Sequence, residues 1–104
     1  MWDIEDIAIS IAGNCRETKI VDNKLISTAI GIDANDGDDI MIHRNRFIAC
    51  TTPIDIDDAD VTRAAVMDNN WYGCTNDMAS GAATNPLITD NIDKAGAWWA
   101  TDDK

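Results

Sequence analysis

The sequence repeats one phrase in the segments Ile20-Val-Asp-Asn23, Ile42-His-Arg-Asn45, Val66-Met-Asp-Asn69 and Ile88-Thr-Asp-Asn91. In each segment an aliphatic residue is followed three positions later by asparagine. The successive asparagines are 22, 24 and 22 residues apart. Self-similarity with a period of about 20 to 50 residues is typical of proteins built from stacked repeats.

Large apolar residues accompany the repeated asparagines. Leu25, Phe47 and Trp71 each follow an asparagine by two positions, and Cys50 and Cys74 align at the same offset of 24 that aligns Phe47 with Trp71. Residues that recur at matched positions of stacked repeats share one buried layer. The sequence therefore predicts that these five residues form a core stack.

The chain also carries isoleucine pairs with period-two alternation, which favours strands. At an offset of 24, Ile30 and Ile32 align with Ile54 and Ile56. Turn-rich acidic segments follow both pairs. Each repeat is thus expected to contain a strand, a turn at asparagine, a second strand, another turn, a third strand and an acidic loop.

Asparagine at a sharp bend has a physical reason. Asparagine tolerates the left-handed backbone conformation that such a bend needs, and its side-chain amide both donates and accepts hydrogen bonds. Amides stacked one coil apart can form a hydrogen-bonded column. We therefore predict an asparagine ladder formed by Asn23, Asn45, Asn69 and Asn91.

This pattern resembles the right-handed parallel β-helix proteins of the pectate-lyase-like group, over about residues 19–94. The resemblance implies an all-β fold, a short right-handed parallel β-helix (β-solenoid) of about four coils with small terminal caps. It divides the chain into an N-terminal strand and cap (1–18), the coils (19–94) and a C-terminal cap or tail (95–104). A small β-sandwich with coincidental asparagine turns is the alternative fold.

Composition narrows the function classes. The chain has 104 residues and a net charge of -11, and 17 of its 19 acidic residues are aspartate. Such a charge disfavours binding to nucleic acid or to an anionic membrane surface. No apolar run approaches the length that spans a bilayer. We therefore expect neither nucleic acid nor a membrane as a partner.

The termini and cysteines give further expectations. The acidic N-terminus does not resemble a secretion signal, and Met1 favours a complete chain made in a cytoplasm. Three cysteines without Cys-x-x-Cys spacing, with one histidine, predict neither a disulfide framework nor a zinc site. Cys50 and Cys74 are expected to be buried thiols, and a disulfide between them is disfavoured because their side chains should run parallel.

The segment Asp33-Ala-Asn-Asp-Gly-Asp-Asp39 resembles a calcium loop in composition. Its glycine and its twelfth residue do not fit the EF-hand pattern. A solvated acidic turn and no metal are expected. A looser Ca²⁺ site formed by Asp33, Asp36 and Asp38 with Asp57 of the next coil is the alternative.

No catalytic residues, enzymatic activity or cofactor are predicted. Polysaccharide lyases of the resembled fold use acidic Ca²⁺ ligands and a basic residue, for which Arg44, Arg46 and Arg63 are available, but no segment matches a lyase motif. His43 is expected at the surface. If the coils stack, Arg44 should form an ion pair with Asp22 or Asp68.

Exposed aromatic residues suggest contacts with a partner. Tyr72, Trp98 and Trp99 are candidates, because one residue of an adjacent tryptophan pair in an extended segment must face outward. They are expected to cover the solenoid end or to contact another chain. Binding of sugar rings is the alternative.

A short solenoid exposes strand edges and apolar ends, and small domains bury little surface. The sequence therefore favours an assembly component. Short β-helices resemble phage virion proteins, which implies a structural capsid decoration (cement) protein on the capsid exterior. Its expected partners are further copies of itself, in a trimer, and the major capsid protein. The alternatives are a carbohydrate-binding or depolymerising tail-spike module and a self-assembling adhesive filament subunit.

Overall fold

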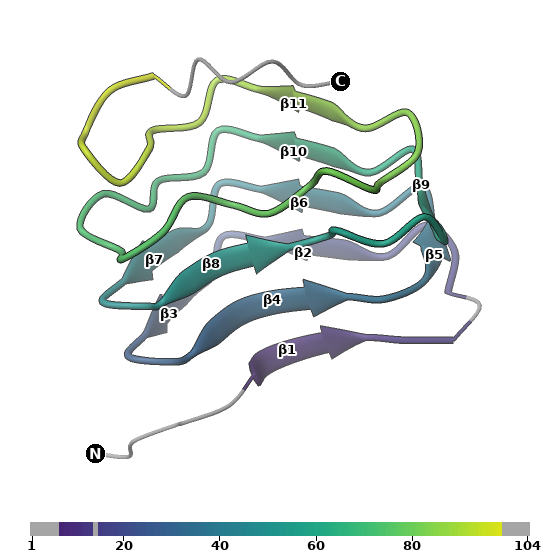
Figure 1. Ribbon diagram of the computed structural model, residues 1–104, viewed down its shortest axis with the longest axis horizontal. Helices are drawn as coiled ribbons and strands as arrows, with labels where there is room; N and C mark the ends of the chain where they lie inside the picture. The colour runs from purple at the N-terminus through teal and green to yellow at the C-terminus, as the bar shows by residue number, and fades with distance from the viewer. Residues whose placement is uncertain (1–6, 14, 99–104) are drawn as a thin grey trace.

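The chain winds into a stack of parallel β-strands (Figure 1). The structure is a computed structural model that describes residues 7–13 and 15–98. Every ladder between its named strands is parallel, and these residues contain no helix. The expected all-β parallel solenoid of about four turns is confirmed.

Four sheets surround the interior, and two of them are pairs of strands. Sheet 1 contains β1 (Ile7–Ile11), β4 (Ile30–Ala34) and β8 (Thr52–Asp55). Sheet 2 contains β2 (Lys19–Val21), β6 (Met41–His43), β10 (Ala65–Met67) and β11 (Leu87–Thr89). Sheet 3 contains β3 (Lys24–Ile26) and β7 (Arg46–Ile48), and sheet 4 contains β5 (Gly37–Asp38) and β9 (Val61–Thr62).

Register aligns equivalent residues of successive coils. In sheet 2, Ile20 pairs with Ile42, and Ile42 pairs with Val66. Val66 in turn pairs with Ile88. The aliphatic residues of the repeated phrase therefore form one buried column, which explains why the phrase requires an apolar residue at its first position.

The predicted alignment of the isoleucine pairs was wrong by two residues. Ile32 pairs with Ile54, at an offset of 22 rather than 24. The two additional residues of that coil lie later, because Asp33 pairs with Asp55 whereas Asp38 pairs with Thr62. The loop after β8 absorbs the extra length, and the buried strands before it keep their register.

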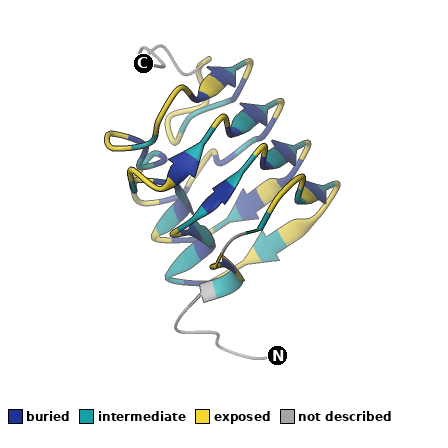
Figure 2. Ribbon diagram, turned by 90° about the vertical axis from the view of Figure 1, so that its right-hand side faces the viewer, coloured by how far each residue is buried: buried dark blue, intermediate teal, exposed yellow. Residues whose placement is uncertain are grey.

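The core runs the length of the solenoid, and buried residues recur at matching places in successive coils (Figure 2). Phe47 and Trp71 are fully buried, and Leu25, the Cα partner of Phe47, packs against the same cluster. A Cβ added to Gly31 would lie 2.7 Å from the Phe47 ring and 2.5 Å from the Pro53 carbonyl oxygen. Glycine at this position leaves the space that the large stacked side chains need.

Candidate functional site

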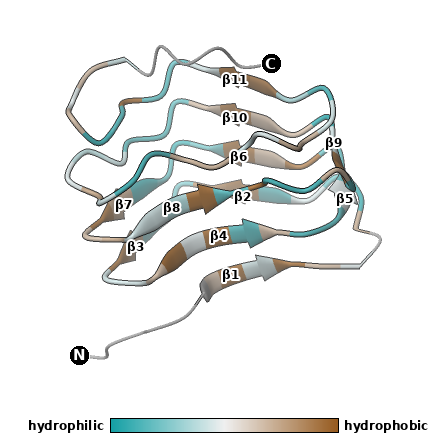
Figure 3. Ribbon diagram, viewed as in Figure 1, coloured by the Kyte–Doolittle hydropathy of each residue, from teal (hydrophilic) through white to brown (hydrophobic). Residues whose placement is uncertain are grey.

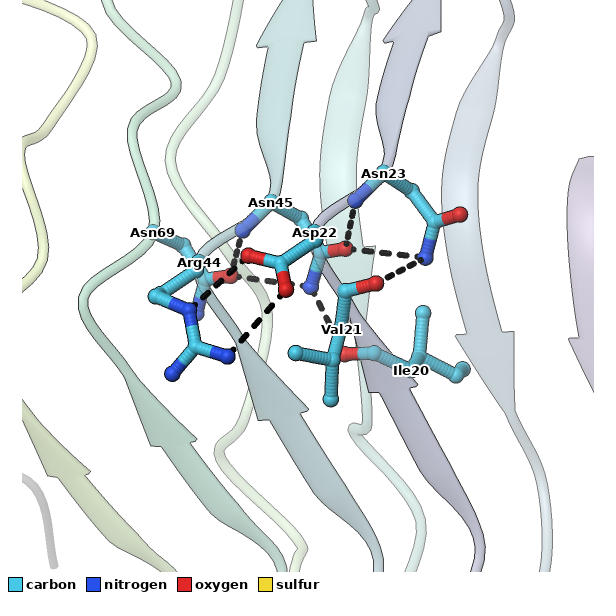
Figure 4. A network of polar contacts seen from close by, with 7 residues as sticks. All are labelled: Ile20, Val21, Asp22, Asn23, Arg44, Asn45 and Asn69. Atoms are coloured by element: carbon cyan, nitrogen blue, oxygen red, sulfur yellow. Dashed lines mark hydrogen bonds and ion pairs between the residues drawn. The ribbon is translucent and has the colours of Figure 1, made fainter.

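The four repeated asparagines form a hydrogen-bonded column at the corner between sheets 2 and 3. Figure 4 shows the first three of them, Asn23, Asn45 and Asn69. Asn23 Nδ2 donates to Asn45 Oδ1 at 3.1 Å, and the same step recurs from Asn45 to Asn69 at 3.1 Å. Asn69 Nδ2 donates to Asn91 Oδ1 at 3.0 Å. Each of the first three asparagines also donates its backbone N–H to the Oδ1 of the next coil.

Each amide of the later coils also reaches back to the preceding coil. Asn45 Nδ2 donates to the Ile20 carbonyl at 2.9 Å, and Asn69 Nδ2 donates to the Ile42 carbonyl at 2.9 Å. The aliphatic residue of the phrase therefore has two roles, because its side chain fills the core and its carbonyl accepts the amide of the next coil. Asn45, Asn69 and Asn91 are buried, whereas Asn23 at the end of the column is exposed.

The left-handed residue at this corner is not the asparagine, which corrects the predicted conformation. The residue before each asparagine has positive φ, namely Asp22 at 61°, Arg44 at 55°, Asp68 at 61° and Asp90 at 59°. An outward-facing residue makes the reversal, and the asparagine that follows points inward. Asparagine is therefore needed for its amide and not for its backbone tolerance.

The next corner follows the same rule with different side chains. Ser27 and Ala49 have φ of 58°, Gly73 has φ of 90°, and each precedes an inward-facing residue, namely Thr28, Cys50 and Cys74. Cys50 Sγ lies 3.7 Å from the Leu25 carbonyl, and Cys74 Sγ lies 3.6 Å from the Phe47 carbonyl. The thiols thus take the place of the asparagine amides at this corner, and both are free cysteines.

The contact between the two thiols shifts their pKa values in opposite directions. A hydrogen bond from Cys74 lowers the pKa of Cys50 to about 6; burial opposes the change, and the Thr28 hydroxyl assists it. The pKa of Cys74 is raised because its thiol donates to Cys50 and is buried. A perturbed pKa in a buried pair does not by itself make a reactive site, because a nucleophilic thiolate also needs access.

Ion pairs link neighbouring coils on the outer surface. Arg44 Nε lies 2.8 Å from Asp22 Oδ1, and Arg63 Nε lies 2.8 Å from Asp39 Oδ1. Hydrogen bonds from these guanidinium groups hold the pKa of Asp22 and of Asp39 below their ordinary value. The four side chains are 48% to 64% exposed, so the contribution of these pairs to stability is small.

Two of the four acidic residues of the candidate calcium site form hydrogen bonds to neighbouring coils. Asp57 Oδ1 accepts a hydrogen bond from the Ala82 N–H, and Asp38 accepts one from the Thr62 hydroxyl. Burial, followed by repulsion from Asp55 and Asp58, raises the pKa of Asp33. Across residues 7–13 and 15–98, no group of three or more His, Cys, Asp or Glu side chains is placed to hold a metal ion.

The exposed aromatics lie towards the C-terminal end of the solenoid. Tyr72 is 56% exposed and Trp98 is 68% exposed, and the Tyr72 ring lies 3.1 Å from a Cβ built on Gly96. Trp98 forms an antiparallel bridge with Ile92, where the chain turns back on itself. Trp99 lies outside the described residues.

Two structural carboxylates were missed by the sequence reasoning. Asp77 Oδ1 accepts the Trp71 Nε1–H at 3.0 Å and the Lys94 N–H at 3.0 Å. Asp93 Oδ1 accepts the N–H groups of Ala95 and Ala97, each at 2.9 Å, and so fixes the C-terminal reversal. The turn signal in Asp93-Lys-Ala-Gly could have indicated the role of Asp93 in the reversal. Nothing in the sequence around Asp77 indicates its contacts with Trp71 and Lys94.

The remaining candidate for chemistry is His43. It lies in β6, and its Nε2 atom is buried without a hydrogen-bond partner in the described part of the chain. Arg44, beside it in sequence, is engaged with Asp22. The candidate residues therefore define a structural site, the asparagine and thiol columns, whose polar groups bond from coil to coil.

Comparisons of the chain with protein-family models, curated proteins and solved structures found no match. The class that the fold and the columns define is an all-β parallel solenoid of about four turns. No helix within residues 7–13 and 15–98 is long and apolar enough to cross a membrane.

Proposed function

We propose that this chain is a structural protein that acts as part of a larger assembly. The observation that carries the proposal is the asparagine column, in which each coil satisfies the next and the side chains serve the framework (Figure 4). A column of this kind favours a rigid body. A stack of coils also leaves strand edges open at its two ends. β2 and β11 are the outer strands of sheet 2 and have no partner on their far side in the described part of the chain. Open edges favour association with another polypeptide.

The particular assembly that we propose is a phage capsid, with this chain as a decoration (cement) protein on its exterior. The small size and net charge of -11 suit a coat exposed to solvent, and burial against the shell would offset the limited core of a short solenoid. The partners would be further copies of the chain, in a trimer, and the major capsid protein. The protein would be made in the host cytoplasm and would need neither cofactor nor catalytic group.

The test is an image of native particles assembled with and without the chain. We expect additional density at fixed sites on the outer shell, and release of the genome at a lower temperature when the chain is missing. A shell without this density would refute the capsid assignment.

A carbohydrate-binding module is the second candidate, because Tyr72 and Trp98 are both more than half exposed. Aromatic faces of this kind stack on sugar rings. A glycan array distinguishes the candidates when Tyr72→Ala is compared with Leu87→Ala, which removes an exposed apolar side chain from sheet 2. Binding lost only with Tyr72→Ala would favour the carbohydrate module over the coat protein.

An end-to-end filament receives less support. Trp98 bridges Ile92 in antiparallel fashion. Ile92 continues the line of parallel bridges that runs through Arg46 and Asn70. The position where another coil would extend this line is therefore already used. Stacking of a second solenoid there would first have to displace the C-terminal reversal.

A further inference from the structure

The outer face of sheet 3 is composed of two columns of different chemistry. Side chains alternate between faces along a strand, so the residues on either side of buried Phe47 and Trp71 point outward. The polar column contains Lys24, Arg46 and Asn70, and the apolar column contains Ile26, Ile48 and Tyr72. Figure 3 shows the change from hydrophilic to hydrophobic along β7.

This face lacks the contacts that would explain its composition. Ile26 is 49% exposed and Tyr72 is 56% exposed. Arg44 and Arg63 form ion pairs, whereas Lys24 and Arg46 form none with the described residues. Two unpaired cations beside exposed apolar side chains are unexpected on a chain of net charge -11.

Sheet 1 carries the complementary charge on its outer face. Asp33 and Asp55 are Cα partners on neighbouring strands. Neither carboxylate forms an ion pair within the described part of the chain. Their mutual repulsion, after burial, raises the pKa of Asp33. A cation placed against this pair would relieve the repulsion.

The two charged columns also have the same spacing. Lys24 and Arg46 lie on adjacent parallel strands, as do Asp33 and Asp55. Both pairs therefore repeat at the strand spacing of about 4.8 Å. When two solenoids lie side by side with parallel axes, one cation can face one carboxylate on each coil.

We propose that sheet 3 is a self-association face, with the Lys24–Arg46 column of one copy seated on the Asp33–Asp55 column of a second copy. The apolar column of Ile26, Ile48 and Tyr72 adds the burial that ion pairs alone do not provide. The contact uses different faces of the two copies, so it closes into a ring or grows as an open chain. The inference rests on the proposed role as an assembly component and names one of its partners.

The test is a charge exchange on the full chain, followed by light scattering and sedimentation. Wild-type chain should associate, and the Lys24→Glu/Arg46→Glu variant should weaken association about tenfold or more. The Asp33→Lys/Asp55→Lys variant should do the same. A mixture of the two variants should restore association in a 1:1 ratio, because the exchanged charges again face each other.

Matched controls separate this contact from a general charge effect. Lys19→Glu/Lys94→Glu makes the same charge change at exposed sites outside sheet 3, and Asp60→Lys/Asp68→Lys makes the opposite change at exposed sites outside the Asp33–Asp55 pair. Both controls should associate like wild type, and circular dichroism checks that every variant folds. If the reversed charges disturb folding, Lys24→Ala/Arg46→Ala takes the place of the reversed variant. It should also weaken association, because it removes the same two cations.

Three results would overturn the proposal: a monomeric wild type, unchanged association in the reversed variants, or a mixture that stays apart. A discrete mass of three copies or a growing mass would each support the contact, and the growing mass would count against the trimeric coat. Purified chain tests self-association, whereas particle imaging tests the capsid assignment. The self-association proposal can therefore fail while the capsid assignment stands, and the reverse is also possible.

Discussion

The asparagine amide is the residue-scale feature on which the coil geometry depends. Asn69 accepts from Asn45 through its Oδ1 and donates through its Nδ2 to the Ile42 carbonyl and to Asn91. No apolar side chain can replace these three contacts. Burial makes the loss costly, because an unsatisfied polar group in the core keeps its full desolvation penalty.

The first prediction concerns this column. Asn69→Ala should lower the free energy of unfolding by about 1 to 3 kcal/mol, because it leaves buried partners in both neighbouring coils. Asn35→Ala, at an exposed site, should be near neutral. Urea denaturation measures both, and equal effects at the two sites would contradict the role assigned to the amide.

The second prediction concerns backbone strain at one corner. Ala49 and Gly73 occupy equivalent left-handed positions, and a Cβ on Gly73 would meet nothing within 4 Å. Left-handed conformation costs a non-glycine residue about 1 to 2 kcal/mol, partly offset by the extra freedom of unfolded glycine.

Ala49→Gly should therefore stabilise the fold and Gly73→Ala should destabilise it, each by about 0.5 to 1 kcal/mol. Thermal unfolding of the two variants gives the sign of each change in stability directly. Changes of the same sign in both would show that another contact decides these positions.

At the scale of the element, a coil is a series of strands joined at corners with a fixed pattern. An inward residue precedes the left-handed residue by two positions and another inward residue follows it, as in Leu25 with Thr28 and Phe47 with Cys50. The chain can vary the second inward residue among asparagine, threonine and cysteine because all three reach a neighbouring coil.

The third prediction concerns the acidic pair of sheet 1. Because the pKa of Asp33 is raised above 3.8 in the folded chain, its charged form opposes folding at neutral pH. This cost disappears as the pH falls through the folded pKa and below 3.8. Asp33→Asn should therefore raise the melting temperature at pH 7 and have no such advantage near pH 3.

Dilute chain at pH values from 3 to 7 should be used, so that association does not contribute to the melting temperature. Asp36→Asn is the control, because Asp36 is not among the charges that act on Asp33. A constant difference between Asp33→Asn and wild type across this range would exclude the electrostatic explanation.

Sequence reasoning succeeded for elements whose signal is local and periodic. The aliphatic–asparagine phrase predicted the parallel solenoid because each amide has its partners at the same position of adjacent coils. It gave the wrong alignment for Ile30 and Ile32, because a single offset of 24 cannot represent a loop that adds two residues after the strand. It also missed Asp77, whose partners Trp71 and Lys94 are fixed only by the three-dimensional path.

At the scale of the whole molecule, stability should vary along the solenoid axis. β6 and β10 each have a parallel neighbour on both sides, whereas β1 has a neighbour on one side in the described part of the chain. In a stacked structure each coil is stabilised chiefly by its neighbours. The ends should therefore open more readily than the middle.

The fourth prediction follows from this gradient. Hydrogen exchange should be slowest in β6 and β10 and fastest in β1 and in residues 93–98. Asp93→Ala removes the acceptor for Ala95 and Ala97, so it should accelerate exchange in residues 93–98 and leave β6 unchanged. Uniform protection along the chain would indicate one cooperative unit instead.

The loop between β8 and β9 accommodates two additional residues while Ile54 and Val61 remain fully buried. The length of this bend can therefore vary without moving the framework, since residues 57–60 lie outside the core. A foreign epitope grafted here would be displayed on a stiff support without changing the coils above and below. The same tolerance makes this bend the natural place for related chains to diverge in length.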